Sequence, residues 1–301
     1  MKKILVSITY YLQLTICIPL SLLPLCVLYL FSDLLYFILY YCVGYRKKVV
    51  RINLQKSFPD KNKDELRRIE REFYAYFCDY FFETIKVLTI SKKQMRKRMS
   101  FSGIEEMLDA AQGRSCIAYL GHYCNWEWIA SLPLHSPDTL HCGQIYHPLK
   151  NEASDRFFLQ LRSRFDAECI SMNNTLRRII AMRNEGKQFV IGFIADQTPA
   201  WASIRYWIDF LHQDTPVFIG PERIAKQTDS VVYYLEVTRP RRGYYHCHFT
   251  PLCLSPNEQP EHAITDMYYQ ALEKTINNAP QYWLWTHKRW KRQRNMEGYA
   301  Y

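Results

Sequence analysis

The cysteines of this chain lack the spacing of a disulfide or zinc framework. Ten cysteines are scattered over 301 residues, with no Cys-x-x-Cys pair and no finger-like arrangement of Cys and His. His246-Cys247-His248 places two histidines on one face of a strand without a third ligand of matching context, so we expect no metal site. We interpret the thiols as reduced, which places the globular part of the chain in the cytosol.

Charged side chains are missing from residues 4–32, a stretch longer than the roughly 20 residues that span a bilayer. A signal peptide is the alternative, but the apolar run is too long for one and no small-residue cleavage site precedes Asp33. Pro19 and Pro24 are expected to kink or interrupt the helix. A second apolar run, residues 34–45, leaves open a spanning helix with an interfacial one, or a re-entrant hairpin.

Acidic residues are too few to balance the basic ones. Lys and Arg total 39 against 29 for Asp and Glu, a formal net charge of +10, so an anionic partner is expected. The basic cluster at residues 46–51 outweighs Lys2 and Lys3, which by the positive-inside rule places the following chain in the cytoplasm. We therefore predict a membrane anchor over residues 1–45 and one cytoplasmic domain over residues 46–301.

The C-terminal segment 285–294 interleaves basic and aromatic residues, a composition that also occurs in nucleic-acid patches. Beside a membrane anchor, the same composition suits anionic lipid headgroups or an acidic carrier protein. We expect no nucleic-acid partner.

No internal repeat or low-complexity linker interrupts the remaining chain. Residues 60–99 have a helical, charged pattern with an aromatic stripe, and short apolar runs then alternate with helical patterns such as 176–184 and 263–277. The runs predicted as strands are 115–120, 140–146, 168–172, 189–195, 231–237 and 244–249. This alternation predicts an α/β fold with a mixed, largely parallel sheet flanked by helices.

A histidine and a glutamate follow the first of these strands. His122 lies on the turn after Gly121, and a helix is expected to begin near Asn125, which is a plausible N-cap. Catalytic groups of open α/β sheets collect at such strand ends. A carboxylate on one imidazole nitrogen leaves the other free to accept a proton, so we expect Glu127 to orient His122 as a general base.

Five sequence blocks in order carry a resemblance to a known family. They are Gly121 to Glu127 (GHYCNWE), Tyr146 to Asn151 (YHPLKN), Leu161 to Phe165 (LRSRF), Ala195 to Pro199 (ADQTP) and Trp283 to Arg289 (WLWTHKR). With the N-terminal anchor, the whole chain resembles the bacterial lipid A biosynthesis acyltransferase (lysophospholipid acyltransferase) family. The implied fold is glycerolipid-acyltransferase-like.

The resemblance implies a reaction and its residues. His122 would deprotonate a hydroxyl of a lipid acceptor, which attacks the thioester of an acyl donor, usually acyl carrier protein, without a covalent enzyme intermediate or a cofactor. Arg162 and Asp196 are family positions associated with the active site, and Arg162 fits the spacing better than Arg164. The expected catalytic set is His122, Glu127, Arg162 and Asp196, and the expected substrate-binding set is Asn125, Arg164, His147, Gln197 and Thr215.

Two residues depart from the family pattern. His147 stands where lipid A enzymes often carry Arg, which puts the identity of the acceptor in doubt. Cys124 invites a Cys–His nucleophile, but neighbouring residues on a turn seldom align in that way.

We therefore expect an acyltransferase at the cytoplasmic face of the inner membrane, with a lipid A precursor as acceptor. A lysophospholipid or aminoacyl lipid is the alternative acceptor. A membrane-bound thioester hydrolase or a non-catalytic lipid-binding protein are the alternatives from other classes.

Overall fold

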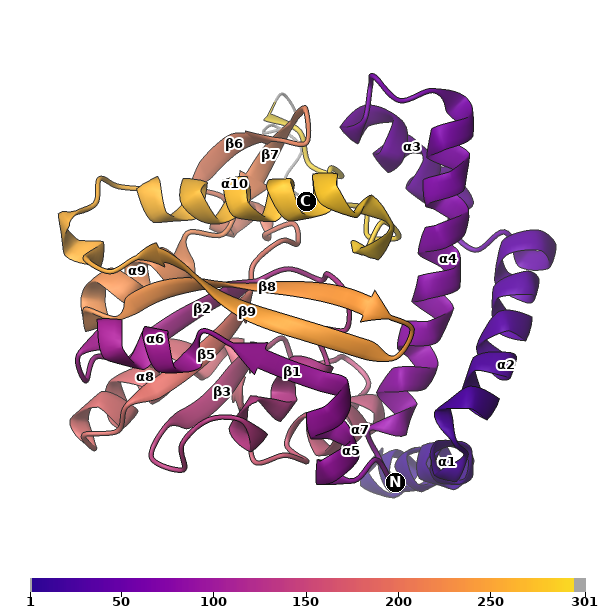
Figure 1. Cartoon of the computed structure of the whole chain (residues 1–301), viewed down its shortest axis with the longest axis horizontal. Coiled ribbons are helices and arrows are strands. Elements are labelled where there is room, and N and C mark those ends of the chain that lie inside the picture. Colours follow the sequence, from indigo (N-terminus) through magenta and orange to yellow (C-terminus); the bar gives the residue numbers. More distant parts are fainter. Residues whose placement is uncertain (1, 295–301) are drawn as a thin grey trace.

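The computed structural model describes residues 2–294, which form a seven-stranded sheet flanked by helices (Figure 1). The strand order is β1-β9-β8-β2-β5-β3-β4, and every pairing in this sheet is parallel except that of β8 with β9. Its strands are β1 (Met99–Ser102), β2 (Cys116–Leu120), β3 (His141–Tyr146), β4 (Glu168–Ser171), β5 (Phe189–Ile194), β8 (Val231–Arg241) and β9 (Tyr244–Cys253). The predicted mixed, largely parallel sheet is confirmed.

All six strands predicted from the sequence are present with small differences at their ends. β2 and β5 are short runs of apolar residues, as expected for strands covered on both faces. β1 and a separate antiparallel hairpin were not predicted, because these strands are short and their residues are mixed in polarity. This hairpin consists of β6 (Tyr206–Phe210) and β7 (Gln213–Val217).

The longest helix, α4, spans Lys63–Lys86 and lies between the N-terminal helices and the rest of the molecule (Figure 1). It begins with a capping box in which the Asn62 side chain accepts from the backbone N–H of Glu65, and the Glu65 carboxylate accepts from the backbone N–H of Asn62. The other helices after residue 46 are α3 (Lys47–Ser57), α5 (Lys92–Arg98), α6 (Ile104–Ala111), α7 (Glu152–Arg162), α8 (Thr175–Asn184), α9 (Gly220–Thr228) and α10 (Ala263–Asn278). Short 3₁₀ segments are η2 (Trp128–Leu134), η3 (Met172–Asn174), η4 (Trp201–Ser203), η5 (Pro256–Glu258) and η6 (Pro280–Tyr282).

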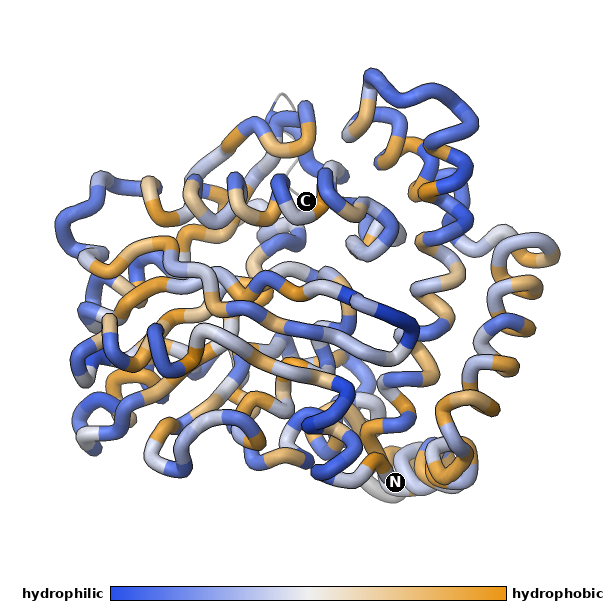
Figure 2. The backbone as a smooth tube through the Cα atoms, in the orientation of Figure 1, coloured by the Kyte–Doolittle hydropathy of each residue, from blue (hydrophilic) through white to orange (hydrophobic). Residues whose placement is uncertain are grey.

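The N-terminal apolar region forms two helices, α1 (Lys2–Leu22) and α2 (Leu25–Phe37), and α2 continues as a π-helix, η1 (Ile38–Val43). As expected, Pro24 interrupts the helix, whereas Pro19 is accommodated inside α1. By length and composition, residues 5–22 and 25–43 are both apolar enough to cross a membrane. Figure 2 shows both helices at the edge of the molecule, largely in the colours of apolar residues.

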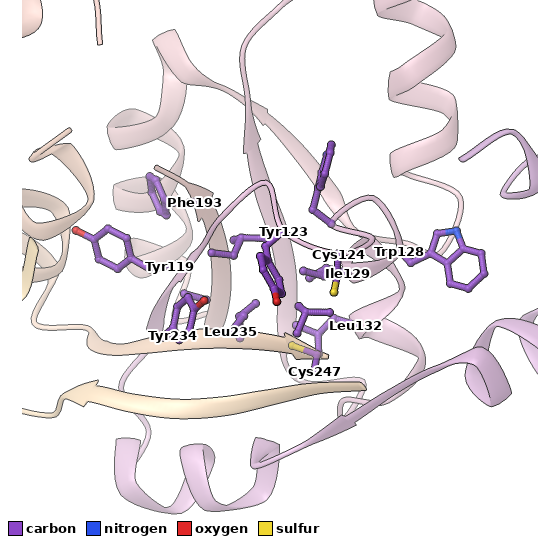
Figure 3. Close-up of a cluster of buried hydrophobic side chains, with 14 of the residues drawn as sticks. Tyr119, Tyr123, Cys124, Trp128, Ile129, Leu132, Phe193, Tyr234, Leu235 and Cys247 are labelled. Atoms are coloured by element: carbon purple, nitrogen blue, oxygen red, sulfur yellow. The ribbon is translucent and has the colours of Figure 1, made fainter. Parts of the chain in front are cut away.

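Buried side chains hold the turn that follows β2 in place. All five residues of β2 are buried, and the core continues through Tyr123, Cys124 and Trp128 beyond the strand (Figure 3). The Trp128 indole N–H donates to the backbone carbonyl of Glu83 at 3.1 Å, and this bond ties the turn to α4. The turn after β2 is therefore fixed by its buried side chains and by this bond to α4.

Candidate active site

His122 lies just beyond the carboxyl end of β2, beside the corresponding end of β5. The parallel register pairs Leu120 with Ile194, so the residues that follow the two strands meet at one edge of the sheet. Gly121 permits this approach, because a Cβ atom there would lie 2.8 Å from Leu272 Cδ1 and 3.3 Å from Asp196 Oδ2.

Asp196 is the carboxylate that binds the His122 imidazole. Its Oδ1 lies 2.6 Å from His122 Nδ1, and its Oδ2 accepts the backbone N–H of His122 at 2.8 Å. The Trp283 indole N–H also donates to Oδ2 at 2.8 Å. Asp196 is buried, with 2 % exposure, while the His122 side chain is 18 % exposed. The carboxylate therefore sits behind the imidazole and holds both its ring and its backbone.

The surroundings of Asp196 keep it ionised. Burial alone would raise the pKa of its carboxyl, but His122, the Trp283 indole and the backbone hydrogen bond outweigh burial and lower the pKa to about 2. The ionised Asp196 accepts a hydrogen bond from the N–H at Nδ1, and this tautomer of the neutral imidazole leaves Nε2 as an acceptor. Nε2 lies 3.0 Å from the side-chain nitrogen of Gln197, which donates to it in this tautomer.

The expected hydrogen bond between Glu127 and His122 is not formed, and this part of the sequence interpretation is corrected. The chain takes a left-handed turn at Cys124 (φ +50°), and a 3₁₀ helix then begins at Trp128 in place of the expected α-helix near Asn125. Glu127 Oε1 and Oε2 instead accept from Arg162 Nη2 and Nε at 2.6 and 2.8 Å.

The Glu127–Arg162 pair joins the turn after β2 to the C-terminal end of α7. The side chains are 6 % and 22 % exposed, so the two-pronged bond is largely shielded from water. Burial alone would lower the pKa of the Arg162 guanidinium, but Glu127 outweighs burial and raises it. Arg162 is thus a fixed, charged group, and Nη1 remains for another acceptor.

His122, Glu127 and Arg162 all line one cavity of about 640 Å³. Its apolar wall comes from small and aliphatic residues of the sheet, including Ala118, Gly192 and Leu235. The polar residues that line it besides the three above include Gln144, Tyr146, His147, Gln197, Thr198, Ser203 and Arg292. A lining that combines charged and polar groups with apolar ones suits an amphipathic ligand.

Of the residues predicted to bind substrate, some line the cavity and others do not. His147 follows β3 and lines the cavity, as Gln197 does. Asn125 is buried away from the lining, where its Nδ2 donates to Glu83 Oε2 at 2.7 Å and its Oδ1 accepts from the Trp128 backbone at 3.2 Å. Arg164 donates to the Ile90 carbonyl at 2.6 Å, outside the cavity.

Thr215 is also outside the cavity. It is fully buried in β7, where its hydroxyl donates to the Gln213 carbonyl at 2.7 Å and accepts from the Trp290 indole at 2.7 Å. The structure therefore gives Asn125, Arg164 and Thr215 contacts within the protein, and a direct substrate contact at these three positions is not supported.

The Cys124 thiol is placed poorly for nucleophilic attack. It is completely buried outside the cavity lining, and burial raises its pKa well above the usual value. Among residues 2–294, moreover, no cluster of three or more His, Cys, Asp or Glu side chains is arranged to hold a metal ion.

The sequence interpretation missed three residues that organise the site. Trp283 binds Asp196, and Arg292 and Thr198 line the cavity. Trp283 and Thr198 stand in two of the sequence blocks quoted above, but a single sequence does not show which strand ends and loops meet. The fold alone brings Trp283, more than eighty positions away, to Asp196.

Comparison with known proteins identifies the family of the chain. The sequence model of a family described as bacterial lipid A biosynthesis acyltransferase matches residues 2–292. A curated relative, the lipid A biosynthesis acyltransferase of Haemophilus influenzae, is 22 % identical over 249 residues, which cover 81 % of this chain and 76 % of the relative. Because the match extends over nearly the whole chain, this protein belongs to the bacterial lipid A biosynthesis acyltransferase family and is an acyltransferase.

Proposed function

We propose that this protein transfers a fatty acyl chain from an acyl carrier protein thioester to a hydroxyl of a lipid acceptor, a lipid A precursor, at the cytoplasmic face of the inner membrane. The observation that carries the proposal is the His122–Asp196 pair, whose Nε2 acceptor opens onto a largely apolar cavity. The family membership and the relative's name support lipid A as the acceptor.

The chemistry begins with the acceptor hydroxyl replacing Gln197 at His122 Nε2. Nε2 takes the hydroxyl proton while the oxygen forms a bond to the thioester carbonyl carbon, which gives a tetrahedral oxyanion. Collapse of this intermediate breaks the C–S bond, and the imidazolium returns the proton to the leaving sulfur. Asp196 stays ionised throughout and stabilises the imidazolium, as its low pKa allows.

The Glu127–Arg162 pair supplies the fixed positive charge near this reaction. Two guanidinium nitrogens are committed to Glu127, which restricts how the side chain can turn. We propose that Nη1 donates to a negatively charged group of the substrates. This group is either the oxyanion that develops from the thioester or a permanently charged phosphate. In this assignment Glu127 acts through Arg162, so it is a positioning residue.

The acyl chain is assigned to the apolar part of the cavity. Ala118 on β2, Gly192 on β5 and Cys142 on β3 face the same side of the sheet, because the register pairs Ala118 with Gly192 and Cys142 with Val190. Their small side chains leave room that larger strand residues would fill. A volume of about 640 Å³ is within the usual range for a small-ligand site.

The acyl donor and the location rest on charge and hydropathy. An acidic carrier protein suits a chain with a net charge of +10, although the same thioester chemistry admits coenzyme A. The two apolar N-terminal helices support membrane attachment. His147 and Arg292 in the lining of the cavity suit an acceptor that carries negative charge.

A donor–acceptor assay with purified protein tests this proposal. Acyl carrier protein thioesters and coenzyme A thioesters are supplied with and without a lipid A precursor or a lysophospholipid. We expect acyl loss from the carrier protein only when the lipid A precursor is present, and its abolition in His122→Ala. Acyl release without any acceptor indicates a thioester hydrolase instead, and unchanged transfer in His122→Ala contradicts the mechanism.

A further inference from the structure

The two apolar N-terminal helices each lie along the globular part of the protein. α1 packs against α7 and α4, and α2 packs against α4. Figure 1 shows α1 nearly end-on, whereas α2 lies close to the plane of the view and runs from top to bottom, so their axes point in different directions. A transmembrane hairpin would instead place the two helices side by side and free of polar contacts with the cytoplasmic domain.

α1 is bound to the domain along more than half of its length. The Tyr10 hydroxyl donates to Gln160 Oε1 at 2.5 Å, and Gln13 donates to Ser154 at 3.0 Å, both on α7. At the other end, Lys86 Nζ of α4 donates to the carbonyls of Ser21 (2.7 Å) and Leu23 (2.9 Å). The turn between α1 and α2 is therefore held on the same side of the membrane as α4.

Only the first part of α1 is left to extend away from these contacts. Residues 2–9 make about 12 Å of helix at 1.5 Å per residue, whereas the hydrocarbon core of a bilayer is about 30 Å thick. α1 therefore cannot cross the bilayer while the contacts at Tyr10, Gln13 and Ser21 persist.

α2 is bound through charged and polar groups in its middle. The Tyr29 hydroxyl donates to Glu83 at 2.9 Å, and the Ser32 hydroxyl donates to Asp79 at 2.7 Å, both on α4. Asp33 forms a salt bridge of 2.6 Å with Arg242, a residue of the turn between β8 and β9.

These contacts would be costly at the centre of a bilayer. A spanning α2 would carry Asp33, Arg242, Asp79 and Glu83 into the hydrocarbon core or break all of their bonds. Each charged side chain at the centre of a membrane costs about 2.5–3.5 kcal/mol on insertion scales. α2 therefore stays at the surface of the domain, at a depth where its polar partners remain on the aqueous side.

The outward faces of both helices are apolar, which is the reverse of an ordinary surface helix. On α1 the exposed large apolar residues are Leu5, Ile8, Tyr11, Leu12, Ile16, Ile18 and Leu22. On α2 and η1 they are Leu30, Phe31, Leu34, Phe37, Ile38, Tyr41 and Val43, and Phe81 of α4 adds to them. We call these fifteen residues the apolar platform. Exposed apolar residues gathered on neighbouring helices in this number mark a site for a lipid surface or a partner.

We infer that neither helix spans the bilayer and that the apolar platform lies in one leaflet, which makes the protein monotopic. Two helices that run in different directions define a plane, and the catalytic part lies on one side of it (Figure 1). Tyr36, Tyr41 and Tyr45 at the end of α2, followed by Arg46 and Lys48, have the composition of an interface with anionic headgroups. This inference rests on the proposed attachment to a membrane and specifies its geometry.

The platform is joined directly to the active site through α7. One face of this helix carries α1 through Gln160 and Ser154, and its last residue, Arg162, lines the cavity. A lipid acceptor in the same leaflet therefore lies at nearly the same membrane depth as the cavity. It can reach the cavity without crossing the bilayer.

Spin labels measure the depth of the platform directly. Single cysteines replace Leu5, Leu12, Leu22, Leu30 or Leu34, one at a time, in full-length protein carrying C17S, C26S and C42S. A label at Lys274→Cys, exposed on α10, serves as the water-accessible control. Each labelled protein is reconstituted into vesicles of phosphatidylethanolamine and phosphatidylglycerol, and collisions with oxygen and with a water-soluble nickel complex are compared.

We expect all five labels to lie in lipid at depths of about 5–10 Å, with none beyond the bilayer midplane. A depth that rises to the midplane along either helix and reaches water on the opposite side overturns the inference. Vesicle flotation distinguishes a different failure: if the protein does not float with vesicles and its labels match Lys274→Cys, the proposed membrane attachment itself is wrong. Retained acyl transfer in each labelled protein shows that the fold is intact.

Discussion

At His122, the choice of which ring nitrogen carries the proton is made by Asp196. The carboxylate accepts from Nδ1, the backbone N–H of His122 and the Trp283 indole, so it cannot turn away from the imidazole. This geometry suits the general base of the proposed function, since it presents the unprotonated Nε2 to the cavity.

Asp196→Asn should therefore preserve the fold and remove most of the activity. The amide can still accept from Trp283, but its N–H₂ group facing Nδ1 forces the proton onto Nε2, the wrong tautomer for a base. We expect kcat for acyl transfer to fall roughly 10²- to 10⁴-fold, by analogy with triads in which this carboxylate is changed to an amide. Asp214→Asn, which changes the same charge in an exposed pair with Arg294, is the matched control. Transfer within threefold of the original in Asp196→Asn would contradict the role.

At the scale of elements, the turn after β2 is held by partners that are distant in sequence. Arg162 arrives from α7, Glu83 from α4 and Asp196 from the end of β5. These contacts make the site an assembly of three separate elements around one strand end, and each partner can be tested alone.

The Glu127–Arg162 pair allows its structural and chemical roles to be separated. Arg162→Ala leaves the carboxylate of Glu127 buried and unpaired, so we expect a loss of about 3 kcal/mol in the free energy of unfolding. The double variant Glu127→Gln, Arg162→Met removes both charges and should recover most of that stability without recovering acyl transfer. Denaturant unfolding and the transfer assay together decide this. Recovery of activity in the double variant would reduce the pair to a structural contact.

Gly192 tests the assignment of the apolar cavity to the acyl chain. A Cβ atom at this position makes ordinary contacts, 3.4 Å to Leu120 Cδ2 and 3.7 Å to the Gly143 carbonyl, so a side chain there can extend into the cavity. Gly192→Leu should reduce transfer of long acyl chains more than short ones, by tenfold or more in the ratio of kcat/KM. The ratio within one protein sample controls for folding. An equal loss for all chain lengths would place the acyl chain elsewhere.

The sequence predicted the elements better than it predicted their partners. β2 and the position of His122 followed from an apolar run that ends at Gly121, which is local information. Glu127 was paired with His122 because the two are close in sequence, but the left-handed turn at Cys124 carries Glu127 toward α7. Asp196 was assigned to the site by resemblance, while its contact with His122 depends on the adjacency of β2 and β5, which a crossover connection hides.

At the scale of the whole molecule, the apolar platform and the basic residues beside it are expected to contribute separately to membrane binding. Apolar insertion does not depend on the lipid charge, whereas basic residues near the surface add about 1 kcal/mol each on anionic membranes. Arg46 and Lys47 are already engaged with Thr286 and Tyr40, so exposed Lys48 is the residue best placed to measure the second contribution.

Lys48→Glu should lower the affinity for vesicles that contain phosphatidylglycerol by about 2 kcal/mol, or roughly 30-fold, at low salt. The difference should shrink at high salt, because the surface potential is screened, and it should vanish on neutral phosphatidylcholine vesicles. Lys274→Glu introduces the same charge change on α10, away from the platform, and should bind anionic vesicles like the unchanged protein (Figure 1). If the two variants lose equal affinity, the attraction comes from the net charge of the molecule and not from a defined basic edge. A loss of affinity confined to Lys48→Glu would instead indicate how the catalytic domain is oriented on the membrane. The end of α2 would then face the headgroups, while the platform fills the leaflet beside it.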